Sequence, residues 1–181
     1  MLKKVLVAVV VLVAALLAVV ATRPGSFRVE RSLVVGAAPP ALYAAVADFH
    51  QWDAWSPWAR LDPAMKTTFE GTTGQVGSSY AWAGNDKVGE GRMTVTEVRP
   101  PTQVKIRLEF LKPWPSTSET TFDLYPETGG TRVVWTMRGD LDLMGKAMSL
   151  FMDMDKAIGP DFERGLASLR QGVEGGTIPR P

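Results

Sequence analysis

The hydrophobic and polar positions along the chain follow three different patterns, and the first is an unbroken apolar run. The run from Val5 to Ala21 contains no polar side chain, and Lys3 and Lys4 stand directly before it. As a helix it would be roughly 25 Å long, near the lower limit for crossing the hydrocarbon core of a bilayer. We therefore expect residues 1–22 to form a membrane anchor, or an uncleaved signal sequence, followed by a linker at 23–26.

The charges beside this run predict its orientation. By the positive-inside rule Lys3 and Lys4 stay in the cytoplasm, which places the following domain on the extracytoplasmic side of an inner or plasma membrane. A cleavable signal peptide is the alternative, because small residues up to Ala21 offer a cleavage site before Thr22, although the run is longer than a signal peptide needs. Both alternatives export the domain.

Residues 27–175 carry the patterns of a folded domain, which begins with one strand and two short helices. Apolar and polar positions alternate over Phe27–Val35, as in a strand. Two adjacent prolines favour the start of a helix within Ala37–Ala47, because the N–H of the first helical residue has no partner in any case. A second short helix or tight turn is expected at Phe49–Trp55.

From Lys66 onward the period of the hydrophobic positions changes to two. Polar and apolar residues alternate from Gln103 to Phe110, which gives a strand one wet and one dry face. Short turns rich in Gly, Pro, Asn or Asp separate the strands and predict an antiparallel meander. The expected strands are Thr67–Gly71, Gly77–Ala83, Lys87–Arg99, Gln103–Leu111, Ser118–Tyr125 and Thr131–Gly139.

A helical period returns in the C-terminal part. One helix is expected at Leu143–Met154, and Gly159 and Pro160 separate it from a second helix, while residues 176–181 are expected to fray. The apolar stripe of the second helix consists of Phe162, Leu166, Leu169 and Val173. These patterns predict an α+β fold in which a curved antiparallel sheet wraps around a long C-terminal helix and leaves a cavity between them.

Composition removes several classes of chemistry. The chain has no cysteine and a single histidine, so disulfides, thiolate catalysis and cysteine or histidine-rich metal sites are excluded. No Gly-rich phosphate-binding motif is present. Without Lys3 and Lys4 the charges of the domain nearly balance, which argues against nucleic acid as a partner. We expect neither a metal nor a cofactor.

Four segments of the chain resemble one protein family. They are Phe49–Trp58 (FHQWDAWSPW), Gly89–Val98 (GEGRMTVTEV), Gly130–Gly139 (GTRVVWTMRG) and Met154–Leu169 (MDKAIGPDFERGLASL). In these segments the chain is similar to bacterial proteins of the polyketide cyclase/dehydrase and lipid-transport group of the START-like (SRPBCC) superfamily, and the resemblance covers residues 27–174. It implies the helix-grip fold, in which a seven-stranded sheet grips the long C-terminal helix around an apolar pocket.

The resemblance implies a cavity more strongly than a reaction. Relatives in this superfamily include lipid carriers, hormone receptors, aromatic polyketide cyclases and domains without an assigned activity. We expect a membrane-tethered, non-catalytic domain that binds a hydrophobic small molecule or lipid in an apolar cavity. Two alternatives stay open, a cyclase/dehydrase-like enzyme acting in the same cavity and a structural or interaction module with a filled core.

Aromatic and methionine side chains are the candidates for ligand binding, because they offer large apolar areas that adapt to a ligand. The expected ligand-binding residues are Trp55, Trp58, Trp82, Phe110, Trp135, Met137, Met148 and Met152. The same residues would also suit a filled core, since core and pocket share a wall in this fold.

His50 and Glu90 are weak candidates for catalysis. An imidazole titrates near neutral pH, and a carboxyl group in a cavity can exchange protons with a substrate. The expected place of His50 at a helix end or turn is typical of a solvated residue, however. Other polar candidates are also better explained as solvated positions: Asn85, Arg92, Glu119, Asp123 and Arg138.

Overall fold

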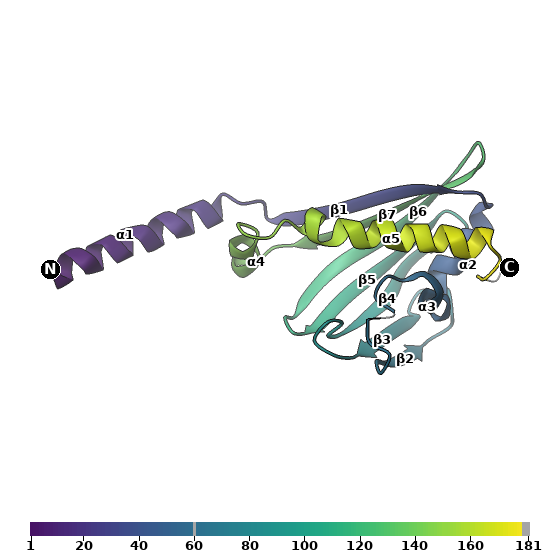
Figure 1. Ribbon diagram of the computed structural model, residues 1–181, viewed down its shortest axis with the longest axis horizontal. Coiled ribbons are helices and arrows are strands. Elements are labelled where there is room, and N and C mark those ends of the chain that lie inside the picture. Colours follow the sequence, from purple (N-terminus) through teal and green to yellow (C-terminus); the bar gives the residue numbers. More distant parts are fainter. Residues whose placement is uncertain (60, 179–181) are drawn as a thin grey trace.

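In the computed structural model, which describes residues 1–59 and 61–178, one helix projects from a domain in which a curled sheet lies against a second long helix (Figure 1). The strands are β1 (Ser26–Val35), β2 (Lys66–Glu70), β3 (Ser79–Ala83), β4 (Glu90–Arg99), β5 (Gln103–Lys112), β6 (Ser116–Glu127) and β7 (Gly130–Asp140). The helices are α1 (Leu2–Ala21), α2 (Pro39–Ala47), the 3-10 turn η1 (Phe49–Gln51), α3 (Trp52–Trp55), α4 (Leu143–Met148) and α5 (Met154–Glu174).

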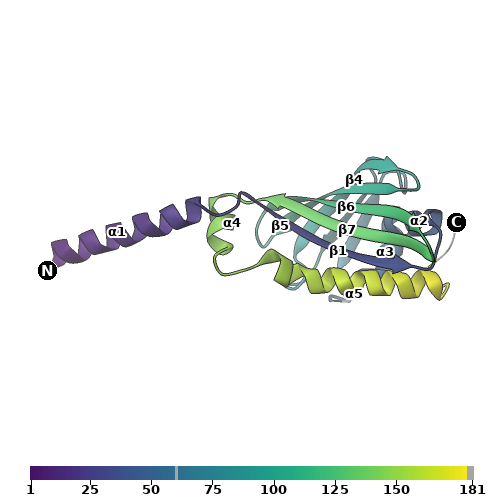
Figure 2. The same ribbon diagram turned by 90° about the horizontal axis from the view of Figure 1, so that it is seen from above.

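Helix α1 stands away from the sheet at the end where β1 begins (Figure 2). Among the described residues it is the one helix that is long and apolar enough to span a membrane, and N-terminal signal sequences share these properties. Its side chains are exposed except for Val20, which is buried at the junction with the domain.

The seven strands form one antiparallel sheet in the order β1-β7-β6-β5-β4-β3-β2. Neighbours from β2 to β7 follow one another in the chain, which confirms the predicted meander. Strand β1 completes the sheet by pairing with β7, with Val29 opposite Met137. The predicted α+β helix-grip fold is therefore present, and α5 lies along β1 in both views (Figures 1 and 2).

The alternation within the strands puts one face of the sheet against α5. In β5 the side chains of Val104 and Ile106 are fully buried, whereas Arg107 is exposed. Helix α5 contributes the predicted stripe, which is buried to 1% exposure or less at Phe162, Leu166, Leu169 and Val173. Burying each such side chain stabilises the fold by about 1.5–3 kcal/mol, so this contact is a principal source of stability.

The break between the two C-terminal helices lies elsewhere than predicted. Helix α5 runs without interruption through Pro160, and the break falls at residues 149–153. The side chain of Asp153 accepts hydrogen bonds from the backbone N–H groups of Asp155 and Lys156, which fixes the start of α5. Pro160 removes one intrahelical hydrogen bond in an exposed turn, where water can replace it, and burial of the helix stripe outweighs that loss.

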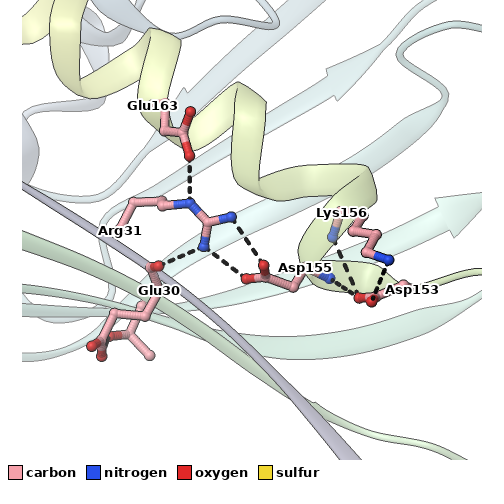
Figure 3. Close-up of polar contacts among 7 residues, drawn as sticks. Glu30, Arg31, Asp153, Asp155, Lys156 and Glu163 are labelled. Atoms are coloured by element: carbon pink, nitrogen blue, oxygen red, sulfur yellow. Dashed lines mark hydrogen bonds and ion pairs between the residues drawn. The ribbon is translucent and has the colours of Figure 1, made fainter.

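Arg31 of β1 holds α5 on both sides of this proline (Figure 3). Its guanidinium contacts both carboxylate oxygens of Asp155, at 2.7 and 3.0 Å, and one oxygen of Glu163, at 2.7 Å. Gly159 lies under the guanidinium, where a Cβ atom would come within 2.0 Å of Nη2. The hydrogen bond from Arg31 lowers the pKa of Asp155, and the two carboxylates raise the pKa of Arg31.

The C-terminal tail starts as an ordered segment, contrary to the prediction that residues 176–181 fray. Gly176 turns the chain back with φ of +73°. The backbone N–H groups of Thr177 and Ile178 then donate to the Gly172 carbonyl, each at 3.0 Å, and Ile178 is 1% exposed. Residues 179–181 of the predicted tail lie outside the described residues.

Candidate functional site

A cavity of about 310 Å³ lies between the sheet and α5. Strands β3 to β7, the segment from α3 to β2, the β3–β4 connection and the first half of α5 supply its walls. The lining consists of Trp52, Asp53, Ser56, Trp58, Ala59, Met65, Tyr80, Trp82, Lys87, Val88, Met93, Leu108, Phe110, Thr120, Trp135, Met137, Ile158, Asp161 and Phe162. Most of this wall is aromatic, aliphatic or methionine surface, as in sites for apolar ligands.

Ring packing fixes the shape of the wall near α5. Trp135 stacks on Phe162 with ring centroids 4.0 Å apart, and Trp58 meets Trp135 edge-on at 5.9 Å. On the opposite side Trp82 donates from Nε1 to the Val88 carbonyl at 2.9 Å, which ties β3 to the β3–β4 connection. The aromatic wall is therefore formed before any ligand arrives.

Polar groups enter the cavity at few positions. Asp53 and Lys87 are exposed, so the cavity reaches the surface where these two side chains lie. Tyr80 is deeper, and burial, together with the charge of Asp53, raises its pKa to about 12. Tyr80 is thus a neutral phenol at physiological pH, able to donate a hydrogen bond but not to act as a base.

The indole N–H of Trp135 is a buried donor without an acceptor among the described residues. Trp135 is 2% exposed and lines the cavity. A buried donor that lacks a partner costs about 1–3 kcal/mol. The N–H is enclosed by protein atoms, so a ligand would meet the apolar ring of Trp135 rather than its donor.

Trp52 and Trp55 serve the local fold. Their Nε1 atoms donate to the carbonyls of Val46 and Ala45, at 3.1 and 3.2 Å, which lie in the last turn of α2. The final carbonyls of a helix have no partner within it, so the two indoles cap α2. Trp55, which we expected to bind ligand, is 1% exposed and lies outside the cavity lining.

Two further expected ligand-binding residues also lie outside the cavity lining. Met148 and Met152 are 46% and 48% exposed, on α4 and on the segment that follows it. The predicted helix Leu143–Met154 would have turned both toward the sheet, but the helix ends at Met148. Five of the expected residues do line the cavity, namely Trp58, Trp82, Phe110, Trp135 and Met137.

The two weak catalytic candidates lie outside the cavity lining. His50 is exposed, contacts Asp48 through Nδ1 at 3.0 Å and stacks on Phe69 at 4.1 Å. Glu90 forms an ion pair with Lys112 at 2.6 Å, beside the edge of the β4–β5 ladder. Among the residues that the structure describes, no group of three or more metal-ligating side chains is placed to hold a metal ion.

Several lining residues were missed by the sequence analysis. Tyr80 shares a face of β3 with Trp82, so the period of two could have found it. Met93 is likewise an inward position of β4. Ile158 and Asp161 depend on α5 starting before Pro160, and the capping residue Asp153 was the signal for that start.

A cavity between a curled antiparallel sheet and a long C-terminal helix defines the START-like class of helix-grip domains. Within this class, the sequence matches the family described as "Polyketide cyclase / dehydrase and lipid transport" over residues 26–174. The chain belongs to that family.

Solved structures share this fold at low sequence identity. Protein CV1439 from Chromobacterium violaceum is 18% identical with a TM-score of 0.58, and the match covers 83% of this chain and 98% of that one. Aha1 from Colwellia psychrerythraea, solved as a dimer, is 20% identical with a TM-score of 0.60 and coverages of 83% and 98%. The di-domain ARO/CYC StfQ from the steffimycin biosynthetic pathway is 10% identical, with a TM-score of 0.60 and coverages of 84% and 52%. No curated protein matches the chain.

Proposed function

We propose that this protein is a membrane-tethered START-like domain that binds a hydrophobic small molecule or lipid between its sheet and α5 and releases it unchanged. The observation that carries the proposal is the cavity of about 310 Å³ with its mostly apolar wall. This volume is at the lower end of the range for ligand pockets, so it suits a compact ligand or one end of a larger one. The cavity also counts against a structural module with a filled core.

A donor in the cavity wall narrows the ligand class to molecules that carry an oxygen acceptor. An apolar molecule with one carbonyl, hydroxyl or carboxylate oxygen would contact the wall and accept a hydrogen bond from the neutral phenol of Tyr80. A pure hydrocarbon would leave the Tyr80 phenol without this acceptor, so we expect it to bind more weakly.

The membrane part of the proposal depends on α1. We propose that α1 crosses an inner or plasma membrane with Lys3 and Lys4 in the cytoplasm, so that the domain lies on the extracytoplasmic side. A retained anchor would keep the cavity beside the bilayer, where hydrophobic molecules concentrate.

The alternative is a cyclase or dehydrase that acts in the same cavity, and it needs a group that moves protons there. The lining carboxylates Asp53 and Asp161 are the candidates, because His50 and Glu90 lie outside the lining. If the protein turns over a poly-carbonyl substrate and Asp53→Asn or Asp161→Asn abolishes this turnover, the result would favour the cyclase or dehydrase alternative. Turnover unaffected by either variant would count against it.

The test is mass spectrometry of the full chain, purified from its membrane, with extraction of bound molecules. Met137→Trp should fill the cavity, while Val76→Trp changes an exposed residue of the β2–β3 connection and serves as the control. We expect a co-purifying hydrophobic molecule in the wild type and in Val76→Trp, with occupancy at least about tenfold lower in Met137→Trp. Equal occupancy in all three proteins would place the ligand elsewhere and defeat the proposal.

A further inference from the structure

Five exposed apolar side chains of the domain lie close together in one segment. The segment after β7 exposes Leu143, Met144, Met148, Phe151 and Met152, and we call these five residues the α4 patch. Phe151 is 90% exposed and Met144 is 69% exposed. Single exposed apolar residues are ordinary on a soluble surface, but several that follow one another in the chain indicate a surface that meets something apolar.

The α4 patch lies where α1 joins the domain. Helix α4 packs beside the C-terminal end of α1, as both views show (Figures 1 and 2), and Val20 is buried there. Arg23 fixes the junction, because its guanidinium donates to the Ser149 carbonyl at 2.7 Å. A membrane that surrounds α1 would therefore reach the α4 patch first.

A second exposed aromatic residue lies at the same end of the sheet. Trp114 is 75% exposed in the turn between β5 and β6. Strand β6 starts just after this turn, and its Ser118 lies opposite Gly139, near the end of β7 that leads into α4. Tryptophan is enriched at the depth of lipid headgroups, because its ring is apolar and its N–H is polar.

One cation within α4 suits an interface with lipid headgroups. Lys146 lies in the last turn of α4, whereas Arg23, at the start of the linker, is held by the Ser149 carbonyl. The Asp142 side chain accepts from the Gly145 backbone N–H at 2.7 Å, so this carboxylate caps α4. A lysine such as Lys146 can extend from an apolar surface to phosphate groups while its stem remains in apolar surroundings.

We infer that the α4 patch and Trp114 insert into the headgroup and acyl boundary of the membrane that α1 crosses. This inference rests on the membrane anchor of the proposed function. The insertion holds the domain against the bilayer in one orientation instead of letting it turn about the linker. Because the α4 patch adjoins α1, which we propose to cross a membrane, the surface that covers the patch is the lipid of that membrane.

The absence of cysteine makes a direct test possible. Single cysteines are introduced at Phe151 and Met144 in the α4 patch, at Leu12 in α1, and at Val76, which is 59% exposed in the β2–β3 connection. Val76 is the matched control, because its connection lies near α2 at the opposite end of the domain. Each full-length variant carries a spin label and is reconstituted into vesicles of phosphatidylcholine and phosphatidylglycerol.

The readout is the accessibility of each label to oxygen, which dissolves in lipid, and to a nickel complex, which stays in water. We expect the labels at Phe151, Met144 and Leu12 to collide with oxygen at least about threefold more often, relative to nickel, than the label at Val76 does. Lipid contact at Leu12 with water contact at Phe151 and Met144 would overturn the inference and leave the anchor intact. Water contact at Leu12 would overturn the anchor and the inference together.

Self-association of the protein could also shield the α4 patch from water. Dilution of the protein distinguishes self-association from membrane insertion. The protein is diluted tenfold at constant lipid concentration. Insertion predicts an unchanged oxygen-to-nickel ratio at Phe151. A ratio that falls to the value of Val76 on dilution would show that copies of the chain cover one another, and it would overturn the inference.

Discussion

Trp135 of β7 and Phe162 of α5 lie almost parallel, with an angle of 8° between their rings and 4.0 Å between their centroids. This contact joins the sheet to the helix at the wall of the cavity. Any shift of α5 away from the sheet would separate the two rings and open the cavity. The position of α5 therefore controls the volume available to a ligand.

Gly165 allows α5 to approach the sheet this closely. A Cβ atom there would lie 2.8 Å from Cζ3 of Trp135 and 3.1 Å from Cδ of Pro57. Because both neighbours are ring atoms, Gly165→Ala should lower the free energy of unfolding by about 1–3 kcal/mol in urea denaturation. Gln171→Ala, on the exposed face of the same helix, should change it by less than about 0.5 kcal/mol. Equal effects of the two variants would contradict the close contact.

Two tryptophan-to-phenylalanine variants should differ although both residues are buried. Trp55→Phe leaves the Ala45 carbonyl without the indole that caps it, whereas Trp135→Phe removes a donor that has no acceptor among the described residues. Trp55→Phe should therefore be the more destabilising by about 1–3 kcal/mol in thermal unfolding of the ligand-free protein. Greater destabilisation by Trp135→Phe would contradict the assignment of the Trp135 N–H as unpaired.

Two proline-to-alanine variants should change the free energy of unfolding in opposite directions. Pro160→Ala restores a backbone N–H inside α5 and should raise the free energy of unfolding by roughly 1–3 kcal/mol. Pro63 lies in the turn closed by the hydrogen bond from the Met65 N–H to the Asp62 carbonyl, so Pro63→Ala should lower it by about 0.4–1 kcal/mol through a more flexible unfolded chain. Destabilisation by Pro160→Ala would show that α5 needs the ring of this proline.

The pair between Arg31 and Asp155 should make stability depend on pH. The pKa of Asp155 is lowered in the folded protein, so its contribution is fully present above its ordinary value of 3.8 and disappears as the pH falls through the lowered value. The melting temperature of the wild type should exceed that of Asp155→Asn near neutral pH, and the gap should close on acidification below that value. Asp86→Asn, in the exposed β3–β4 connection, is the control for the loss of a surface carboxylate. If the difference in melting temperature between the wild type and Asp155→Asn widens in acid, the pKa of Asp155 is not lowered by folding.

Much of the fold could be predicted because alternation is a local signal. In β5, for example, the alternation in the sequence identifies Val104 and Ile106 as the inward face. The helix break was misplaced because Pro160 carries a strong local signal, while the burial of α5 and its attachment to Arg31 depend on distant strands. Contacts between residues far apart in the chain leave no periodic pattern in the sequence.

The cavity could be predicted only in outline. Trp58 and Trp55 occupy similar places in one motif, yet Trp58 lines the cavity and Trp55 caps α2. Which indole turns inward depends on the angle between α3 and the sheet, and the sequence does not encode that angle locally. Met148 was misplaced for a related reason, since its side chain depends on where α4 ends.

The short connection between α1 and β1 limits where the domain can work. Helix α1 ends at Ala21 and β1 begins at Ser26, so the intervening residues can extend roughly 14 Å at most. With α1 embedded as we propose, the domain cannot travel between two membranes with its cargo. It would instead stay at one membrane and exchange molecules with the adjacent leaflet or with a mobile carrier.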